Sequence, residues 1–169
     1  MYGVTKGLGE TMAEYYSANH GLSTIVLRAT GYLRHEAFGP DGDVDWDQAD
    51  LPSIAARMVN AGAKIYNPAD LGPIFEAALA LPDVPFERLL IGQTLPFTDE
   101  DESACRHDPV AAWEKHYPGA AEFFAGSGYQ PPPLTHVYDN ARSRERLGFA
   151  MQYDLGDVIS AWRLQQGSR

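Results

Sequence analysis

The chain has 169 residues, of which 44% are hydrophobic and 11% aromatic, and its formal net charge is -10. These values are typical of one globular domain with a real core, and they exclude a disordered chain. The acidic balance argues against nucleic acid as a partner, and no apolar run approaches the roughly 18 residues of a membrane helix. The single cysteine, Cys105, excludes an internal disulfide framework and indicates a reducing cytoplasm.

The first third of the chain predicts a helix, a strand and a loop. Apolar residues recur at spacings of three and four over residues 4–19, which indicates a helix. His20-Gly21 predicts its end, because glycine readily takes the left-handed conformation. Residues 23–27 form an apolar run without polar alternation, as expected of a parallel strand covered on both faces. Residues 31–50 are predicted to be a polar loop, and residues 52–60 a helix.

The middle of the chain predicts two further strands around one helix. A short strand is expected over residues 64–66, and residues 67–70 open a helix that ends near Leu81. Residues 88–91 predict another buried strand, which Gly92 closes. The helix has an apolar stripe that we expect to face the core: Leu71, Ile74, Phe75, Ala78 and Leu79.

The last third is predicted to be mainly helical. Helices are expected over residues 109–116 and 120–125, followed by a short helix capped by Asn140 and a final helix capped by Asp154. No internal repeat or domain boundary is visible, so residues 1–169 are expected to form a single segment.

The sequence Tyr2-Gly3-Val4-Thr5-Lys6 has the form Y-x-x-x-K. Residues four apart lie on one face of a helix, so the phenol and the ammonium can meet one substrate. A nearby ammonium stabilises the phenolate, which suits a tyrosine to general acid or base catalysis. Such a pattern also arises by chance, and the alternative is a fraying first turn with Lys6 in solvent.

Several further motifs follow in the same order as in one known family. The catalytic helix continues with Gly9-Glu10, and the next strand ends in Leu27-Arg28. Other matching stretches are residues 67–71, 88–92, 138–142 and 147–149. Together they resemble the C-terminal half of an NAD(P)-dependent epimerase/dehydratase of the extended short-chain dehydrogenase/reductase family.

The resemblance implies an α/β, partial Rossmann-like fold, with C-terminal strands and a substrate-binding lobe. Tyr2 is expected to exchange the substrate's hydroxyl proton, and Lys6 to assist it and hold the nicotinamide ribose. Thr30, Gly31 and Tyr32 are expected to border the nicotinamide. The implied cofactor is NAD or NADP, the implied substrate a small sugar-like or other carbonyl compound, and full-length relatives form homodimers.

The chain also departs from the family pattern. It contains no Gly-rich turn between a strand and a helix, which in relatives binds the dinucleotide pyrophosphate. Ala29 replaces the usual proline, and the short connection over residues 64–70 puts a nucleotide-sugar substrate in doubt. We therefore expect a truncated enzyme that is inactive alone. The alternative is a non-catalytic module that docks onto a separate N-terminal half or another partner.

Two groups of residues resemble metal sites, and neither matches a known pattern. The alternating aspartates over residues 41–47 lack the glycine and glutamate of a calcium loop, because those positions hold Trp46 and Pro52. Cys105, His107 and His116 do not have zinc spacing. We expect no metal, and we expect the acidic stretches over 41–50 and 99–102 to be solvated loops.

Overall fold

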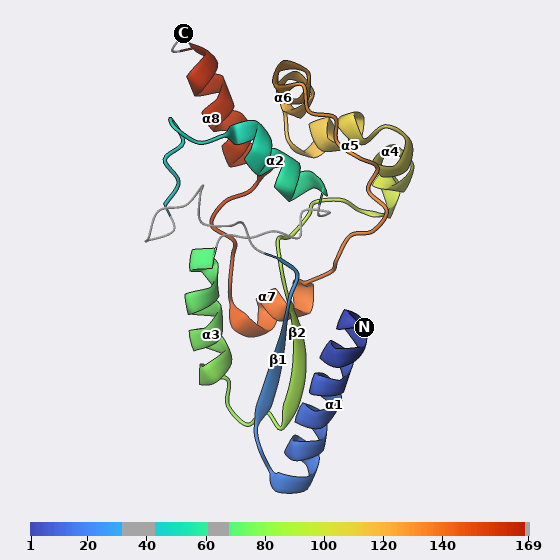
Figure 1. Cartoon of the computed structure of the whole chain (residues 1–169), viewed down its shortest axis with the longest axis vertical. Coiled ribbons are helices and arrows are strands. Elements are labelled where there is room, and N and C mark those ends of the chain that lie inside the picture. Colours follow the sequence, from blue (N-terminus) through green and yellow to red (C-terminus); the bar gives the residue numbers. More distant parts are fainter. Residues whose placement is uncertain (32–42, 61–67, 168–169) are drawn as a thin grey trace.

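A computed structural model describes residues 1–31, 43–60 and 68–167, which form a sheet lobe and a helical lobe (Figure 1). The sheet lobe comprises α1 (Tyr2–His20), β1 (Thr24–Ala29), α3 (Leu71–Ala80), β2 (Phe86–Ile91) and α7 (Ala141–Leu147). The helical lobe comprises α2 (Leu51–Asn60), α4 (Glu102–His107), α5 (Pro109–His116), α6 (Ala120–Ser127) and α8 (Leu155–Gly167). The predicted strand over residues 64–66 lies outside the described residues.

The two strands pair in parallel, with Thr24 opposite Phe86 and Ala29 opposite Ile91. Because side chains alternate along a strand, the two faces of the sheet meet different helices. Helices α3 and α7 pack with Leu27 and Leu89 on one face, and α1 contacts the sheet on the other. The predicted α/β class, with mostly helices and a parallel sheet, is confirmed.

Within the described residues, helices lie on both faces of β1 as expected, but the strand is only partly buried because one of its edges is unpaired. Residues 24–27 are half-buried, and Arg28 and Ala29 are exposed. Strand β2 pairs with one edge of β1, and no described strand pairs with the other. An edge strand loses the neighbour that would bury its outer side, so its apolar residues stay in contact with solvent.

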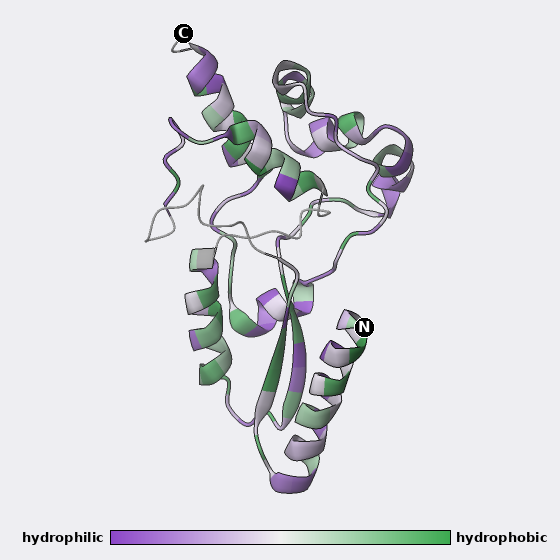
Figure 2. Cartoon of the chain, in the orientation of Figure 1, coloured by the Kyte–Doolittle hydropathy of each residue, from purple (hydrophilic) through white to green (hydrophobic). Residues whose placement is uncertain are grey.

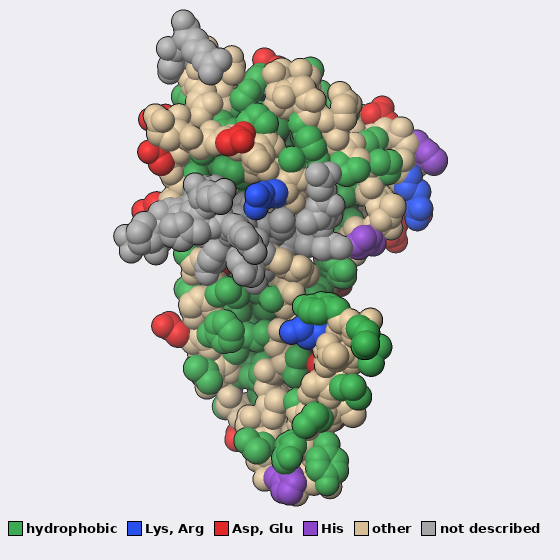
Figure 3. Space-filling view, in the orientation of Figure 1, with side chains coloured by type: hydrophobic (Ala, Val, Ile, Leu, Met, Phe, Trp, Pro, Cys, Tyr) green, Lys and Arg blue, Asp and Glu red, His purple; other side chains and the backbone are tan. Residues whose placement is uncertain are grey.

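Helix α1 ends as predicted but carries an exposed apolar face. Gly21 closes it in the left-handed conformation, at a φ of 66°. Figure 3 shows hydrophobic side chains along its outer surface, and Figure 2 shows the hydropathy of the residues along the helix. Besides Tyr2, which lines the groove described below, five apolar residues of α1 are exposed and are called the α1 apolar face: Val4, Leu8, Met12, Tyr15 and Tyr16.

The predicted apolar stripe of α3 is only partly buried. Ile74 and Ala78 pack in the core of the sheet lobe, whereas Phe75 and Leu79 are exposed. The stripe is wider than the contact, because only one edge of it reaches the narrow two-stranded sheet.

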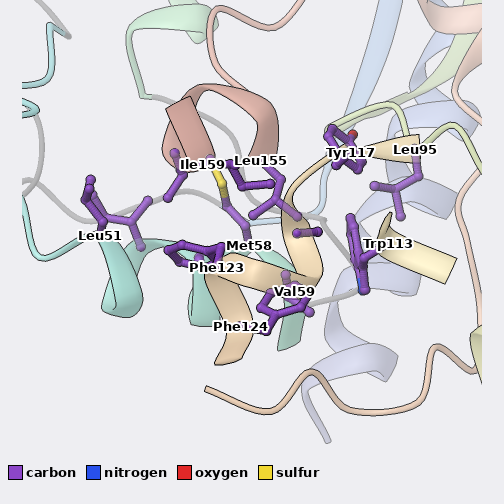
Figure 4. Packing of buried hydrophobic residues seen from close by; sticks show 14 of the residues in the cluster. Leu51, Met58, Val59, Leu95, Trp113, Tyr117, Phe123, Phe124, Leu155 and Ile159 are labelled. Atoms are coloured by element: carbon purple, nitrogen blue, oxygen red, sulfur yellow. The ribbon is translucent and has the colours of Figure 1, made fainter. Parts of the chain in front are cut away.

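The main core lies in the helical lobe. Aromatic side chains from α5 and α6 meet aliphatic ones from α2 and α8 (Figure 4). The labelled residues of this core are Leu51, Met58, Val59, Leu95, Trp113, Tyr117, Phe123, Phe124, Leu155 and Ile159. The predicted helix over residues 109–116 is confirmed by α5, which Asp108 caps and Pro109 begins.

The prediction of a solvated loop over residues 99–102 is wrong. Thr98 and Asp101 form a capping box that opens a 3-10 turn and then α4. Asp101 is buried and accepts hydrogen bonds from Lys115 Nζ at 2.6 Å and Thr98 N at 2.9 Å, and its carboxylate contacts His116 Nε2 at 2.9 Å. These donors, Lys115 first, hold the pKa of Asp101 well below its usual value.

The two predicted helix caps have different outcomes. Asp154 Oδ1 accepts the Gly156 amide at the start of α8, so its capping role is confirmed. Asn140 precedes α7, but its side chain makes no cap bond. Its amide instead donates to Gly92 O at 2.6 Å, while Asp139 accepts the Ala141 amide. The predicted cap at Asn140 is therefore wrong, because a long-range partner takes its side chain.

Candidate functional site

A groove of about 790 Å³ follows β1 toward its carboxyl end and lies between α1 and α3. In α/β folds this end of a parallel sheet is where ligands bind. The lining residues come from four segments: Tyr2, Lys6, Gly9 and Glu10; residues 26–31; Leu71 and Phe75; and Ile91. Four predicted site residues therefore share one groove, namely Tyr2, Lys6, Thr30 and Gly31, while Tyr32 lies outside the described residues.

The i, i+4 spacing of Tyr2 and Lys6 brings their side chains together as predicted. The Lys6 ammonium lies over the Tyr2 ring, 5.4 Å from the ring centroid. An ammonium over an aromatic face is attracted by the ring electrons. Tyr2 is 76% exposed, so its hydroxyl is open to the groove and to solvent. The pair thus offers a phenol next to a cation at an accessible position.

The part of the groove formed by the end of β1 is fixed to the end of β2. The Thr30 amide donates to Ile91 O at 3.0 Å, and its hydroxyl donates to the same oxygen at 3.2 Å. Gly92 packs so closely that a Cβ there would lie 2.5 Å from Thr30 Oγ1. The backbone at Thr30, just before Gly31, is therefore held in place by the end of β2.

A network of ion pairs attaches α1 to the sheet beneath the groove. Glu10 accepts two hydrogen bonds from Arg28, at 2.9 and 2.6 Å, and a third from Arg88 at 3.2 Å. Arg88 also donates to Glu14 at 2.6 Å. The hydrogen bond from Arg28 is the main cause that lowers the pKa of Glu10. Glu10 and Arg28, which both line the groove, thus neutralise each other's charge.

Leu71 and Phe75 also belong to the site, although no sequence motif marks them. Both belong to the apolar stripe of α3, which we expected to face the core, and both line the groove instead. They give the groove an apolar wall opposite the polar wall of α1. The sequence did offer one sign of this, because the apolar stripe of α3 is too wide for all of its residues to pack against the sheet.

The candidate metal residues do not converge. Among residues 1–31, 43–60 and 68–167, no group of three or more His, Cys, Asp or Glu is placed to hold a metal ion. His116 contacts the carboxylate of Asp101, and Cys105 is buried, which raises the pKa of its thiol. No helix within these residues is long and apolar enough to cross a bilayer.

Comparisons with known proteins give no assignment. No protein-family model matches the chain, and the searches of curated proteins and of solved structures gave no significant match.

Proposed function

We propose that the chain carries the catalytic helix and substrate lobe of an NAD(P)-dependent extended short-chain dehydrogenase/reductase. The observation that carries this proposal is the shared groove of Tyr2, Lys6, Thr30 and Gly31. Tyr2 and Lys6 belong to one motif, and Thr30 and Gly31 follow another. Their distance in sequence does not require the two pairs to share a groove. In this proposal the fold is the C-terminal part of a Rossmann-like domain.

The groove fits one end of the dinucleotide. Lys6 can donate to ribose hydroxyls, and the fixed backbone at Thr30, with Gly31 next to it, can border a flat ring. The sequence contains no Gly-rich turn after an apolar strand, the element that binds the pyrophosphate in dinucleotide-binding folds. We propose that another polypeptide segment supplies this turn and pairs with the open edge of β1.

The chain's own residues then perform the proton transfer. When bound, NAD or NADP exchanges a hydride with a carbon–oxygen centre of the substrate. Tyr2 moves the proton of the reacting hydroxyl through its phenolic oxygen. Lys6 stabilises negative charge on that oxygen. Arg28 and Glu10 keep α1 at a fixed height above the sheet, so that the phenol stays aligned with the groove.

The α1 apolar face supports a second candidate function, a non-catalytic docking module. Five large apolar side chains on one helix are more than scattered surface residues, and such a patch marks an interaction site. In this case the groove would hold a strand of the partner and no cofactor.

The two candidates are separated by reconstitution. The chain alone is expected to bind neither NAD nor NADP with useful affinity in calorimetric titrations, because it lacks the pyrophosphate turn. After fusion to a Gly-rich half encoded immediately upstream, we expect binding and dinucleotide-dependent oxidation or reduction of a carbonyl compound. A fused protein that binds partners but never dinucleotide would support the docking module.

A further inference from the structure

A second pocket lies beyond the carboxyl end of β2 and shares no lining residue with the groove. It measures about 450 Å³, within the range of small-molecule sites. Residues from the segment after β2, from α4, from residues 134–140 and from α7 line it, and it is called the α4–α7 pocket below. One wall comes from Asp99 and from α4, in and next to the acidic stretch that was expected to be a solvated loop.

The walls of the α4–α7 pocket are held by specific bonds. The Leu134 amide donates to Cys105 O at 2.8 Å and ties two walls together. Asn140 donates to Gly92 O and accepts the Thr94 hydroxyl proton at 3.1 Å. The pocket is therefore preformed, which lowers the entropic cost of binding a ligand.

Its charges do not suit an anion. The lining contains three carboxylates, on Asp99, Glu102 and Asp139, against two guanidiniums, on Arg106 and Arg144. Glu102 already pairs with Arg106 at 3.0 Å. The groups left are the carboxylates of Asp99 and Asp139 and the guanidinium of Arg144. A phosphate would therefore face more negative than positive charge, which disfavours its binding.

The hydrogen-bonding groups need a ligand that both donates and accepts. The Thr94 and Thr98 hydroxyl protons point to Asn140 and Asp101, so toward a ligand these oxygens are acceptors. The carboxylates also accept, whereas Arg144 can only donate. A hydroxyl group satisfies both kinds, while a phosphate only accepts and an ammonium only donates. Aromatic rings of Phe97 and Tyr138 add apolar surface for C–H groups.

We propose that the α4–α7 pocket binds a neutral polyhydroxylated small molecule, such as an unphosphorylated sugar ring. This binding goes beyond the function proposed above and does not rest on it, because the pocket shares no lining residue with the groove that holds Tyr2. Part of this specificity comes from the wall residues on α4, Glu102 and Arg106.

The test uses the full 169-residue chain without dinucleotide, so its result is independent of any turnover. Neutral probes (D-glucose, D-galactose, D-xylose) are titrated by NMR, and the best is compared with its phosphorylated and amino derivatives. We expect millimolar binding of a neutral sugar and about tenfold weaker binding of both derivatives. Tighter binding of the phosphate or the amine, or no binding of any neutral probe in the millimolar range, would overturn the proposal.

Variants locate the binding. Arg144→Gln and Tyr138→Ala remove lining groups and should each weaken the neutral probe about tenfold. Glu145→Gln changes the next residue of α7, which does not line the pocket, and should leave binding unchanged. Equal loss in all three variants, or no loss in the first two, would show that the probe binds elsewhere.

Discussion

The Arg28 guanidinium donates two hydrogen bonds to the Glu10 carboxylate, from Nε at 2.9 Å and from Nη2 at 2.6 Å, although the two residues are 18 positions apart in the sequence. One residue belongs to α1 and the other to β1. A two-point contact of this kind fixes orientation as well as distance. It sets the position of the helix that carries Tyr2 and Lys6.

Removing this contact should loosen α1. Glu10→Gln keeps the shape of the side chain but loses its charge toward Arg28 and Arg88. We expect faster amide hydrogen exchange in α1 and a melting temperature lower by a few degrees. Glu14→Gln is the matched control, because Glu14 pairs only with Arg88 and is more exposed. A larger effect of Glu14→Gln would contradict the anchoring role of Glu10.

Glu87 predicts a pH dependence of stability. Its buried carboxylate pairs with Arg146 at 2.9 Å and Arg142 at 2.7 Å, and these bonds lower its pKa below the usual 4.5. A lowered folded-state pKa stabilises the fold at neutral pH, and this contribution disappears as the pH falls below 4.5. Glu87→Gln should cost about 2 kcal/mol at neutral pH, measured by urea unfolding. The difference from the unsubstituted chain should shrink steadily in acid, and a constant difference would refute the assignment.

Gly92 is predicted to control the position of Thr30. In Gly92→Ala the new Cβ would lie 2.5 Å from Thr30 Oγ1. Since a β-branched side chain has few rotamers, the strain should cost about 1–3 kcal/mol. Thr30→Ala removes the clashing atoms, so the double variant should recover part of this loss in a thermal or urea melt. Additive losses would show that the two residues do not press on each other.

The α1 apolar face should make the chain self-associate. Its local apolar contacts act at short range, whereas the net charge of -10 opposes association only through screened repulsion. Leu8→Glu with Met12→Glu should shift the light-scattering mass toward the 18.6 kDa monomer. Leu79→Glu, at an exposed position on α3, is the control and should not. A monomeric parent chain would show that this face needs no partner.

Local sequence signals predicted several helix boundaries, whereas contacts between residues far apart in the sequence could not be predicted. Proline and aspartate mark the start of α5, and a glycine marks the end of α1, so these bounds followed from the sequence. Asp101 was misjudged because its partners, Lys115 and His116, lie 14 and 15 residues away. Four charges in a row predict a solvated loop unless the later cation is known to fold back.

The candidate site divides in the same way. The spacing of Tyr2 and Lys6 is local, so their meeting was predictable from helix geometry. That Thr30 lies in the same groove was expected only from the family resemblance, because no local pattern shows where β1 ends relative to β2. The α4–α7 pocket was not foreseen, because its walls come from segments more than forty residues apart.

The central claim is that Tyr2 is the proton-transferring group of a dinucleotide-dependent enzyme. Its most direct test is Tyr2→Phe in the protein fused to a Gly-rich half, with turnover and dinucleotide binding measured on the same sample. We predict a loss of turnover of about 100-fold or more with binding nearly unchanged, while Tyr16→Phe, on the same helix but away from the groove, keeps full turnover. Turnover retained by Tyr2→Phe would contradict the account.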